Sequence, residues 1–190
     1  MQLLEERIRR DGKVYDGDIL KVDGFLNHRI DVGFVCELGK EFYRLFGDCG
    51  VNKILTVEAS GIGVACLTAQ YFGCPVVFAK KSRTSNQDAA VWSSSAHSYT
   101  HNTDHTIIVS REYLGKGDKV LILDDFLANG CAAQALLDIC GQAGAEVAGI
   151  GIVIEKAYQN GGKVLREKGI RVESLARVAS MNPEDGITFC

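Results

Sequence analysis

One stretch of this chain decides its fold: residues 119–132, which read KVLILDDFLANGCA. Residues 120–123 form a short apolar run of branched side chains, which is typical of a strand buried on both faces. Asp124 and Asp125 end this strand, and a turn of small residues follows. Residues 132–140 are then apolar at helical spacing, and the helix is expected to stop at Gly144, the usual left-handed cap. The order of strand, acids, tight loop and helix predicts an α/β fold with a parallel sheet.

The tight loop between the strand and the helix predicts a site for an anion. Main-chain N–H groups at a helix start have no partner within the helix and bind anions well. The carboxyl end of a parallel strand is also where open α/β sheets bind their ligands. An anion held next to Asp124 and Asp125 suggests a phosphorylated sugar whose hydroxyl groups contact the acids, directly or through a metal. The alternative is that the two aspartates only end a strand and cap a helix.

The composition indicates a single globular domain. The chain has 190 residues, of which 46% are hydrophobic and 24% are charged, with a formal net charge of -3. This balance excludes disorder of the bulk and gives no electrostatic reason to expect a nucleic acid. The longest apolar run, residues 147–154, is too short to cross a bilayer. The acidic N-terminus does not resemble a signal peptide, so we expect a cytoplasmic protein that does not enter a membrane.

Metal sites built from cysteine or histidine are not expected. The seven cysteines are odd in number and form no C-x-x-C pair, and most lie in apolar patterns, so we expect reduced thiols that act as small core side chains. His97, His101 and His105 recur at i, i+4 and i+8, but no acid or cysteine completes a ligand set. They lie in a polar segment, residues 82–105, with little periodicity. This segment favours a mobile cover that excludes water from a site.

Strands and helices alternate along the rest of the chain. The expected helices are 3–10, a helix capped by Asp31 that carries the apolar residues from Phe34 to Phe46, a helix ending at about Phe72, and 162–168. The expected strands are 53–57, 75–79, 106–109, 146–154, 172–178 and 187–189. The apolar stripe of the second helix can belong to the core or to an interface between chains.

A second loop between a strand and a helix contains Gly61 and Gly63. This pair invites a dinucleotide-binding interpretation, but Cys66 stands where the third glycine of that fingerprint would be. A backbone loop that approaches an anion fits the residues better. Lys80 and Lys81 end the following strand, where cations would suit a doubly charged leaving group. A solvated charged corner is the alternative interpretation of these two lysines.

The motifs of this chain resemble those of a known family. Residues 119–132 resemble the motif that binds 5-phosphoribosyl diphosphate (PRPP) in type I phosphoribosyltransferases. Within that family the chain is similar to the bacterial xanthine enzymes in three further runs: LKVDGFLNH (20–28), GIGIVIEK (149–156) and RVESLAR (171–177). By pattern alone, residues 19–28 could form one wall of a pocket for a flat ring or a loop packed over the core.

The resemblance implies the type I phosphoribosyltransferase fold, an open and mainly parallel sheet flanked by helices in one domain over residues 1–190. It implies a small hood formed by the chain ends, about 1–50 and 156–190, and a flexible catalytic loop at about 82–105. It also implies a homodimer.

The resemblance further implies an enzyme of purine salvage, a pentosyltransferase that converts xanthine and PRPP to xanthosine 5′-monophosphate and pyrophosphate with Mg²⁺. Asp124 and Asp125 would be catalytic and would hold the ribose hydroxyls or Mg²⁺, directly or indirectly. The implied PRPP-binding residues are Ala128, Asn129, Gly130, Cys131 and Ala132. The implied pyrophosphate-binding residues are Ala59, Ser60, Gly61 and Lys81, with Lys80 as a further candidate. The implied xanthine-binding residues are Leu20, Asn27 and Lys156.

Some features leave alternatives open. Type I enzymes in general favour Thr or Ser in the phosphate loop, whereas this loop has Ala128 and Cys131, so those hydroxyl contacts are missing while the main-chain donors remain. A side-chain contact from Cys131 stays open. Lys156 can only donate hydrogen bonds, which suits a 6-oxo purine and disfavours the amino group of adenine. Asn27 could recognise the 2-oxo group of xanthine, but guanine or hypoxanthine stays open as the main substrate. A non-catalytic PRPP-binding regulator is a further alternative, although the N-terminal region is too short for a DNA-binding module.

Overall fold

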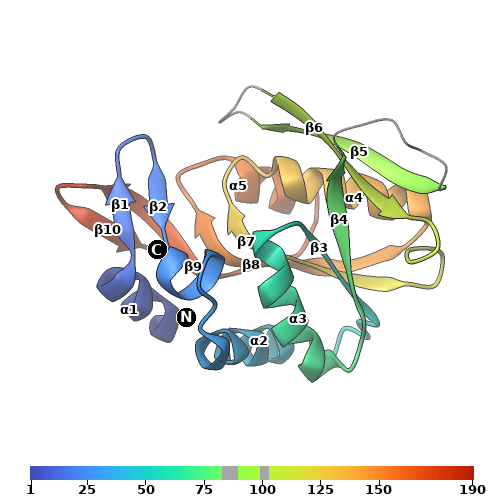
Figure 1. Ribbon diagram of the computed structural model, residues 1–190, viewed down its shortest axis with the longest axis horizontal. Coiled ribbons are helices and arrows are strands. Elements are labelled where there is room, and N and C mark those ends of the chain that lie inside the picture. Colours follow the sequence, from blue (N-terminus) through green and yellow to red (C-terminus); the bar gives the residue numbers. More distant parts are fainter. Residues whose placement is uncertain (83–89, 99–102) are drawn as a thin grey trace.

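The computed structural model describes residues 1–82, 90–98 and 103–190 (Figure 1). The helices are α1 Gln2–Asp11, α2 Val32–Phe46, α3 Ser60–Phe72, α4 Cys131–Ala143 and α5 Gly161–Glu167, and a π-helical turn η1 spans Asp23–Asn27. The strands are β1 Lys13–Tyr15, β2 Ile19–Lys21, β3 Lys53–Val57, β4 Val76–Ser82, β5 Val91–Ser98, β6 Thr103–Ser110, β7 Lys119–Leu127, β8 Glu146–Lys156, β9 Val172–Asn182 and β10 Gly186–Phe189.

A large mixed sheet forms the centre of the protein. Within the described residues its strand order is β10-β9-β8-β7-β3-β4-β6-β5. The strands from β9 to β4 run parallel to one another. The edge strands β10, β6 and β5 pair antiparallel. The prediction of an α/β fold with an open, mainly parallel sheet flanked by helices is therefore confirmed.

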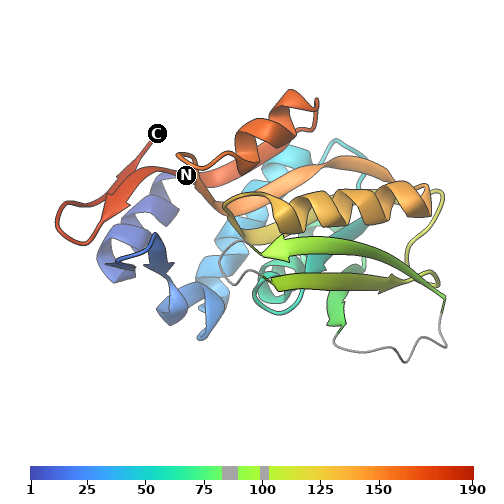
Figure 2. The same cartoon turned by 90° about the horizontal axis from the view of Figure 1, so that it is seen from above.

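The helices cover the two faces of this sheet (Figures 1 and 2). The apolar side chains of α2 and α3 join one core cluster, and those of α4 join the cluster on the other face. Asp31 begins α2 as predicted, because its carboxylate accepts a hydrogen bond from the main-chain N–H of Phe34 at 3.2 Å. The apolar stripe of α2 lies in the core, where its buried members are Val35, Leu38, Phe42 and Phe46.

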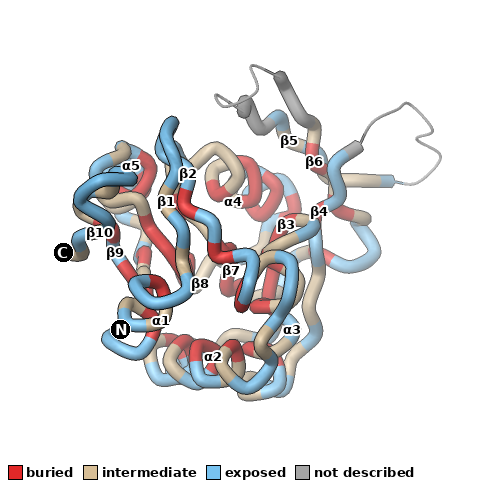
Figure 3. Tube along the Cα trace, turned by 60° about the vertical axis from the view of Figure 1, so that its left-hand side comes forward, coloured by how far each residue is buried: buried red, intermediate tan, exposed pale blue. Residues whose placement is uncertain are grey.

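Strand β7 is longer than the sequence pattern predicted. Its pairing with β8 continues to Leu127, which lies opposite Glu155. Asp124 and Asp125 are therefore inside the strand, and the prediction that they end it is wrong. Figure 3 shows the chain coloured by burial, with its buried segments in red. Each of the two aspartates is only 7% exposed. The pattern did not indicate this because charged residues are rarely buried, so acids after an apolar run normally signal the end of a strand.

The segment 82–105, predicted to lack regular structure, contains most of an antiparallel pair of strands. β5 and β6 pair from Val91 opposite Ser110 to Ser98 opposite Thr103. The strand β5 was not predicted because its sequence is polar. It lies at the edge of the sheet, where polar residues such as Ser93 can remain exposed to solvent. Residues 83–89 and 99–102, with His101 and much of the expected catalytic loop, lie outside the described residues, as do the side chains of His97 and His105.

The two ends of the chain meet beside β9 and form what we call the terminal layer: α1, β1, β2, η1 and β10 (Figures 1 and 2). The N-terminal amino group donates to the main-chain oxygen of Leu175 in β9. The guanidinium of Arg7 lies 5.1 Å from the ring centres of both Phe25 and Phe34 and forms an ion pair with Asp31 at 3.1 Å. These contacts join α1 to η1 and α2.

The cysteines differ from their predicted setting. All seven are free thiols, as expected. Only Cys140 is buried, however, while Cys66 and Cys190 are exposed and the other four are half-buried. The prediction that most of them are core side chains is wrong, because an apolar neighbourhood in sequence does not decide which face of a helix a residue occupies. In the described part of the chain, no helix is both long enough and apolar enough to cross a membrane.

Candidate active site

The acid pair lies near the carboxyl end of β7. The main-chain N–H of Asp125 donates to Oδ1 of Asp124 at 3.0 Å. Burial raises the pKa of the Asp124 carboxyl well above its ordinary value, and the neighbouring Asp125 carboxyl raises it further, whereas the charge of Lys81 lowers it. The Asp124 carboxyl therefore takes up a proton more readily than an ordinary aspartate, and it lies next to a second buried acid. Such a pair is suited to accept hydrogen bonds from hydroxyl groups or to face a cation.

The predicted phosphate loop, residues 128–132, follows β7 and is open to solvent. Asn129 is exposed and the other residues of the loop are half-buried. The first buried residue after the loop belongs to α4. Gly130 precedes α4 with a φ of 82°, a left-handed conformation that favours glycine. No side chain of the described residues caps the first turn of α4. Its main-chain N–H groups therefore remain available to an anion.

Helix α5 supports the phosphate loop from behind. The N–H of Gly161 donates to the main-chain oxygen of Ala128 at 3.1 Å. A β-carbon on Gly161 would overlap Ala128 and Gly130, so the helix approaches the loop more closely than any other residue would allow. The next residue, Gly162, lies against the carboxylate of Glu155 in the same way. The position of the loop thus depends on how α5 is held.

Glu155, a buried residue, holds α5 through an ion pair with the half-buried Arg166. Its two carboxylate oxygens accept from the two terminal nitrogens of Arg166, both at 2.7 Å. Ser174 donates to the same carboxylate at 2.5 Å, and Arg177 lies 3.3 Å from it. Burial favours the neutral form of Glu155, but the hydrogen bonds from Arg166 and Ser174 outweigh it and lower the pKa of Glu155.

The second predicted loop, Ala59–Gly61, lies next to the acid pair. Helix α3 begins at Ser60, and no side chain of the described residues caps its first turn. A β-carbon on Gly61 would overlap Oγ1 of Thr56 and would lie 3.2 Å from Oδ1 of Asp124. The main-chain N–H of Lys81 donates to the Glu58 carboxylate at 2.6 Å, which ties the end of β4 to the same loop. The structure therefore brings the predicted pyrophosphate-binding residues to the acid pair.

Lys156 ends β8 at the same sheet edge. Its Nζ donates to the main-chain oxygen of Asp18, in the turn between β1 and β2, at 2.6 Å. Burial lowers the pKa of Lys156. Burial, together with the charge and hydrogen bond of Asp18, raises the pKa of Tyr158 to about 12. The terminal layer therefore reaches over the end of β8 and covers the lysine predicted to contact a base.

Two amide side chains near this region have unused acceptors. Oδ1 of Asn27, in η1, is buried and has no hydrogen-bond partner among the described residues. Oε1 of Gln159, three residues after Lys156, is also buried without such a partner. A buried unpaired acceptor is costly unless a ligand supplies the donor. Asn27 was predicted from the sequence, whereas Gln159 was not, because nothing in its local pattern distinguishes it from a loop residue.

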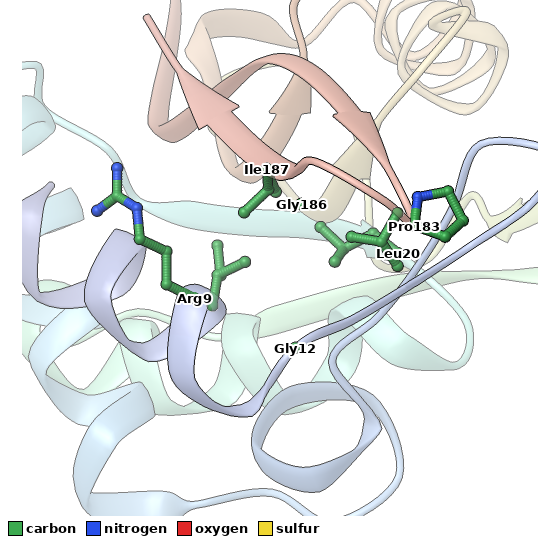
Figure 4. A pocket seen from close by; sticks show the side chains of 8 residues that line it. Arg9, Gly12, Leu20, Pro183, Gly186 and Ile187 are labelled. Atoms are coloured by element: carbon green, nitrogen blue, oxygen red, sulfur yellow. The ribbon is translucent and has the colours of Figure 1, made fainter.

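Leu20, the third residue predicted to bind a base, lies in β2. Its side chain is 7% exposed and lines a cavity of about 370 Å³ within the terminal layer (Figure 4). The other lining residues are Ile8, Arg9, Gly12, Val14, Pro183, Gly186 and Ile187. The guanidinium of Arg9 lies 4.7 Å from the ring centre of Phe189. The predicted contact between Leu20 and a purine therefore stays a prediction.

The acid pair is the feature that fits a divalent cation. The described residues contain no group of three or more His, Cys, Asp or Glu side chains that could enclose a metal. Two carboxylates alone suit Mg²⁺, which is held by one or two protein carboxylates together with oxygens of a substrate and water. The donor set is therefore compatible with a cation that arrives with a phosphorylated ligand.

The sequence of this chain is similar to those of known phosphoribosyltransferases. Residues 42–173 match the family model described as phosphoribosyl transferase domain. The chain is 56% identical, over 98% of its own length and 96% of the relative's, to a protein of Lachnoclostridium phytofermentans named xanthine phosphoribosyltransferase. It is 55% identical to xanthine phosphoribosyltransferase 2 of Clostridium botulinum over 93% of each chain.

Solved structures show the same fold at low identity. Adenine phosphoribosyltransferase of Trypanosoma brucei superimposes with a TM-score of 0.78 at 14% identity, covering 92% of this chain and 79% of that one. The Giardia lamblia enzyme superimposes with a TM-score of 0.77 at 20% identity, covering 92% and 97%. The family model and the near-full-length relatives together show that the chain belongs to the phosphoribosyltransferase family.

Proposed function

We propose that the protein transfers the 5-phosphoribosyl group of PRPP to xanthine, forming xanthosine 5′-monophosphate and releasing pyrophosphate in purine salvage. The observation that carries this proposal is the identity of 54% to 56%, over nearly the whole chain, with several relatives named xanthine phosphoribosyltransferase. The geometry supports it, because α3, α4 and the pair of carboxyls lie at the carboxyl ends of the parallel strands. No side chain of the described residues caps the first turn of either helix.

On the PRPP side, the chain supplies main-chain donors and two acids. The N–H groups of residues 128–132 and the dipole of α4 would hold the 5′-phosphate. Asp124 and Asp125 would accept hydrogen bonds from the ribose hydroxyls and offset positive charge on the ring as its bond to the diphosphate breaks. Ala59–Gly61 and Lys81 would hold the departing pyrophosphate. Catalysis would therefore come from placement and electrostatics, without a protein nucleophile.

Mg²⁺ would be held by Asp124 and Asp125, directly or through water, together with oxygens of PRPP. When bound, it would supply positive charge that neutralises the leaving diphosphate. The contribution of the protein is to keep the two carboxylates facing the ligand.

On the base side, Lys156 and Asn27 would select the purine. The ammonium of Lys156 only donates hydrogen bonds. It therefore favours a base that presents an oxo group or an unprotonated ring nitrogen and disfavours one that presents an amino group. The amide Nδ2–H of Asn27 can donate to the 2-oxo group of xanthine, and its Oδ1, which has no partner among the described residues, can accept from a ring N–H of the base. A contact from Leu20 completes the proposed set.

The same proposal includes the hood over the base, the oligomeric state and the cellular location of the enzyme. The terminal layer, with the chain beyond Lys156, would act as a hood over the base, because the turn at Asp18 already covers Lys156. We propose a homodimer, which light scattering after gel filtration would test. Seven free thiols suit a reducing compartment, which supports a cytoplasmic location.

A comparison of bases tests the function directly. The purified protein is incubated with PRPP and Mg²⁺ and with xanthine, guanine or hypoxanthine in turn, and base and nucleotide are separated by chromatography. We expect PRPP-dependent conversion of xanthine at the highest kcat/KM. A higher kcat/KM for guanine or hypoxanthine would reassign the substrate, and PRPP binding without conversion of any of the bases would indicate a regulator.

A further inference from the structure

Thr56 is a fully buried polar residue that the proposed mechanism does not use. It lies in β3, whose sequence KILTV is otherwise apolar after its first residue. Its exposed fraction is 0%, and its Oγ1 has no hydrogen-bond partner among the described residues. A buried hydroxyl without a partner costs free energy, and valine has nearly the same shape without that cost. Packing alone therefore does not explain a threonine at this position.

The surroundings of Thr56 indicate what its hydroxyl serves. The point where a β-carbon on Gly61 would lie overlaps Oγ1 of Thr56 and is 3.2 Å from Oδ1 of Asp124. The hydroxyl and the carboxylate oxygen thus approach the same side of one glycine. Oδ1 of Asp124 already accepts from the N–H of Asp125, and a carboxylate oxygen has room for a second donor. The hydroxyl therefore lies beneath the first turn of α3, on the same side of Gly61 as an acceptor with a free position.

We propose that Thr56 is a positioning residue, whose hydroxyl donates to Oδ1 of Asp124 in the complex with PRPP and fixes that carboxylate toward the ribose. This inference rests on the proposed function. A side chain at position 61 would occupy the space that both oxygens approach, and glycine leaves this space open.

The chain offers a matched control in Thr68. This residue is also 0% exposed, and its Oγ1 also has no partner among the described residues. It lies in α3 facing α2, because its Cα is 3.1 Å from the point where a β-carbon on Gly39 would lie. Thr56→Val and Thr68→Val therefore remove the same kind of hydroxyl, one beside the acid pair and the other between two helices.

The test measures steady-state kinetics, the melting temperature and calorimetric binding of PRPP for both variants. We expect Thr56→Val to keep or raise the melting temperature, to lower kcat about tenfold and to weaken PRPP binding, with the KM for xanthine unchanged. Thr68→Val should keep wild-type kinetics. Thr56→Ser should recover most of the kcat that Thr56→Ala loses, and this pair carries the test if Thr56→Val does not fold.

Three results would overturn the inference. They are wild-type kcat and PRPP binding in Thr56→Val, equal losses in Thr56→Val and Thr68→Val, and no advantage of Thr56→Ser over Thr56→Ala. A failure of the proposed function is distinguishable from these results, because the wild-type protein itself would then show no PRPP-dependent loss of xanthine.

Discussion

The two halves of the candidate site are built in different ways. The phosphate half comes from one continuous piece of chain, in which β7, the loop 128–132 and α4 follow one another. The base half is assembled from Asp18 and Asn27, which lie in two turns near the N-terminus, and from Lys156 at the end of a strand far along the chain. The first half is set by local geometry, and the second depends on how the terminal layer packs.

This difference implies that changes in the two halves should affect different kinetic constants. In the proposed mechanism the phosphate half contacts the groups whose charge changes as the bond breaks, so it should govern kcat and PRPP binding. The base half would contact atoms that identify the purine, so it should govern the KM and the choice of base.

The largest effect is expected for Asp125→Asn, which keeps the size of the side chain but removes a charge from the phosphate half. Loss of a preorganised group that stabilises charge in the transition state typically costs 10²- to 10³-fold in kcat, and we expect a loss of about that size. Circular dichroism and thermal melting would show that the variant folds. Asp138→Asn, which changes an exposed aspartate of α4, is the control and should keep wild-type kcat. An unchanged kcat in Asp125→Asn would remove the pair from the mechanism.

Lys156→Ala should show the opposite kinetic pattern. A hydrogen bond to a charged group contributes about 1.5–3 kcal/mol, so we expect the KM for xanthine to rise about 10- to 100-fold. PRPP affinity, measured by calorimetry without a base, should remain within about twofold of wild type. Lys163→Ala, a change at a lysine whose side chain is 73% exposed, controls for loss of a positive charge nearby. If PRPP affinity falls and the KM for xanthine holds, Lys156 belongs to the phosphate half.

Prediction from sequence succeeded where structure is local. The bounds of β3, the capping of α2 by Asp31 and the left-handed glycine after α4 all follow from a few adjacent residues. The tight loop between β7 and α4 was located for the same reason. The continuation of β7 past Asp124 was missed, because the pairing with β8 that holds it cannot be read from β7 alone.

The parts that sequence could not predict depend on contacts between distant segments. In the sequence Thr56 is an ordinary residue of a strand. Only the structure shows that its hydroxyl and a carboxylate oxygen of Asp124 lie on the same side of Gly61. In the sequence Glu155 only ends an apolar run. The structure shows that it pairs with Arg166. For Gln159, only the packing of the terminal layer reveals a buried oxygen without a partner. A polar residue within a buried strand is the one signal that would have indicated Thr56 and Glu155.

A smaller effect, confined to the phosphate half, is expected for Gly61→Ala. The added β-carbon would overlap Oγ1 of Thr56 and approach Asp124, so the first turn of α3 must move. We expect PRPP affinity to fall about tenfold, which corresponds to about 1.4 kcal/mol, while the KM for xanthine changes little. At Gly63 an added β-carbon meets only the tip of the Ile30 side chain, which is 42% exposed and can move aside. Gly63→Ala should therefore bind PRPP like the wild type, and equal losses in both variants would contradict the geometry at Gly61.

The ion pair between Glu155 and Arg166 connects the two halves, because Glu155 precedes Lys156 and the paired α5 supports the phosphate loop. Glu155→Gln should lower the free energy of unfolding at neutral pH by about 1–2 kcal/mol. This is less than for a fully buried pair, since the Arg166 side chain is 34% exposed. Glu173→Gln, which alters a more exposed pair with Arg171, should change it by less than about 0.5 kcal/mol.

The pH dependence of this loss has a definite sign. Hydrogen bonds from Arg166 and Ser174 outweigh burial and place the folded pKa of Glu155 below its ordinary value of 4.5. As the pH falls through 4.5 the unfolded chain takes up a proton first, so the stability that the carboxylate supplies at neutral pH is lost toward the lowered folded pKa. Urea unfolding between neutral and acidic pH should therefore show the wild type and Glu155→Gln converging as the pH falls. A gap that stays constant would mean that Glu155 acts through its shape, and the two halves would then be joined by packing rather than by charge.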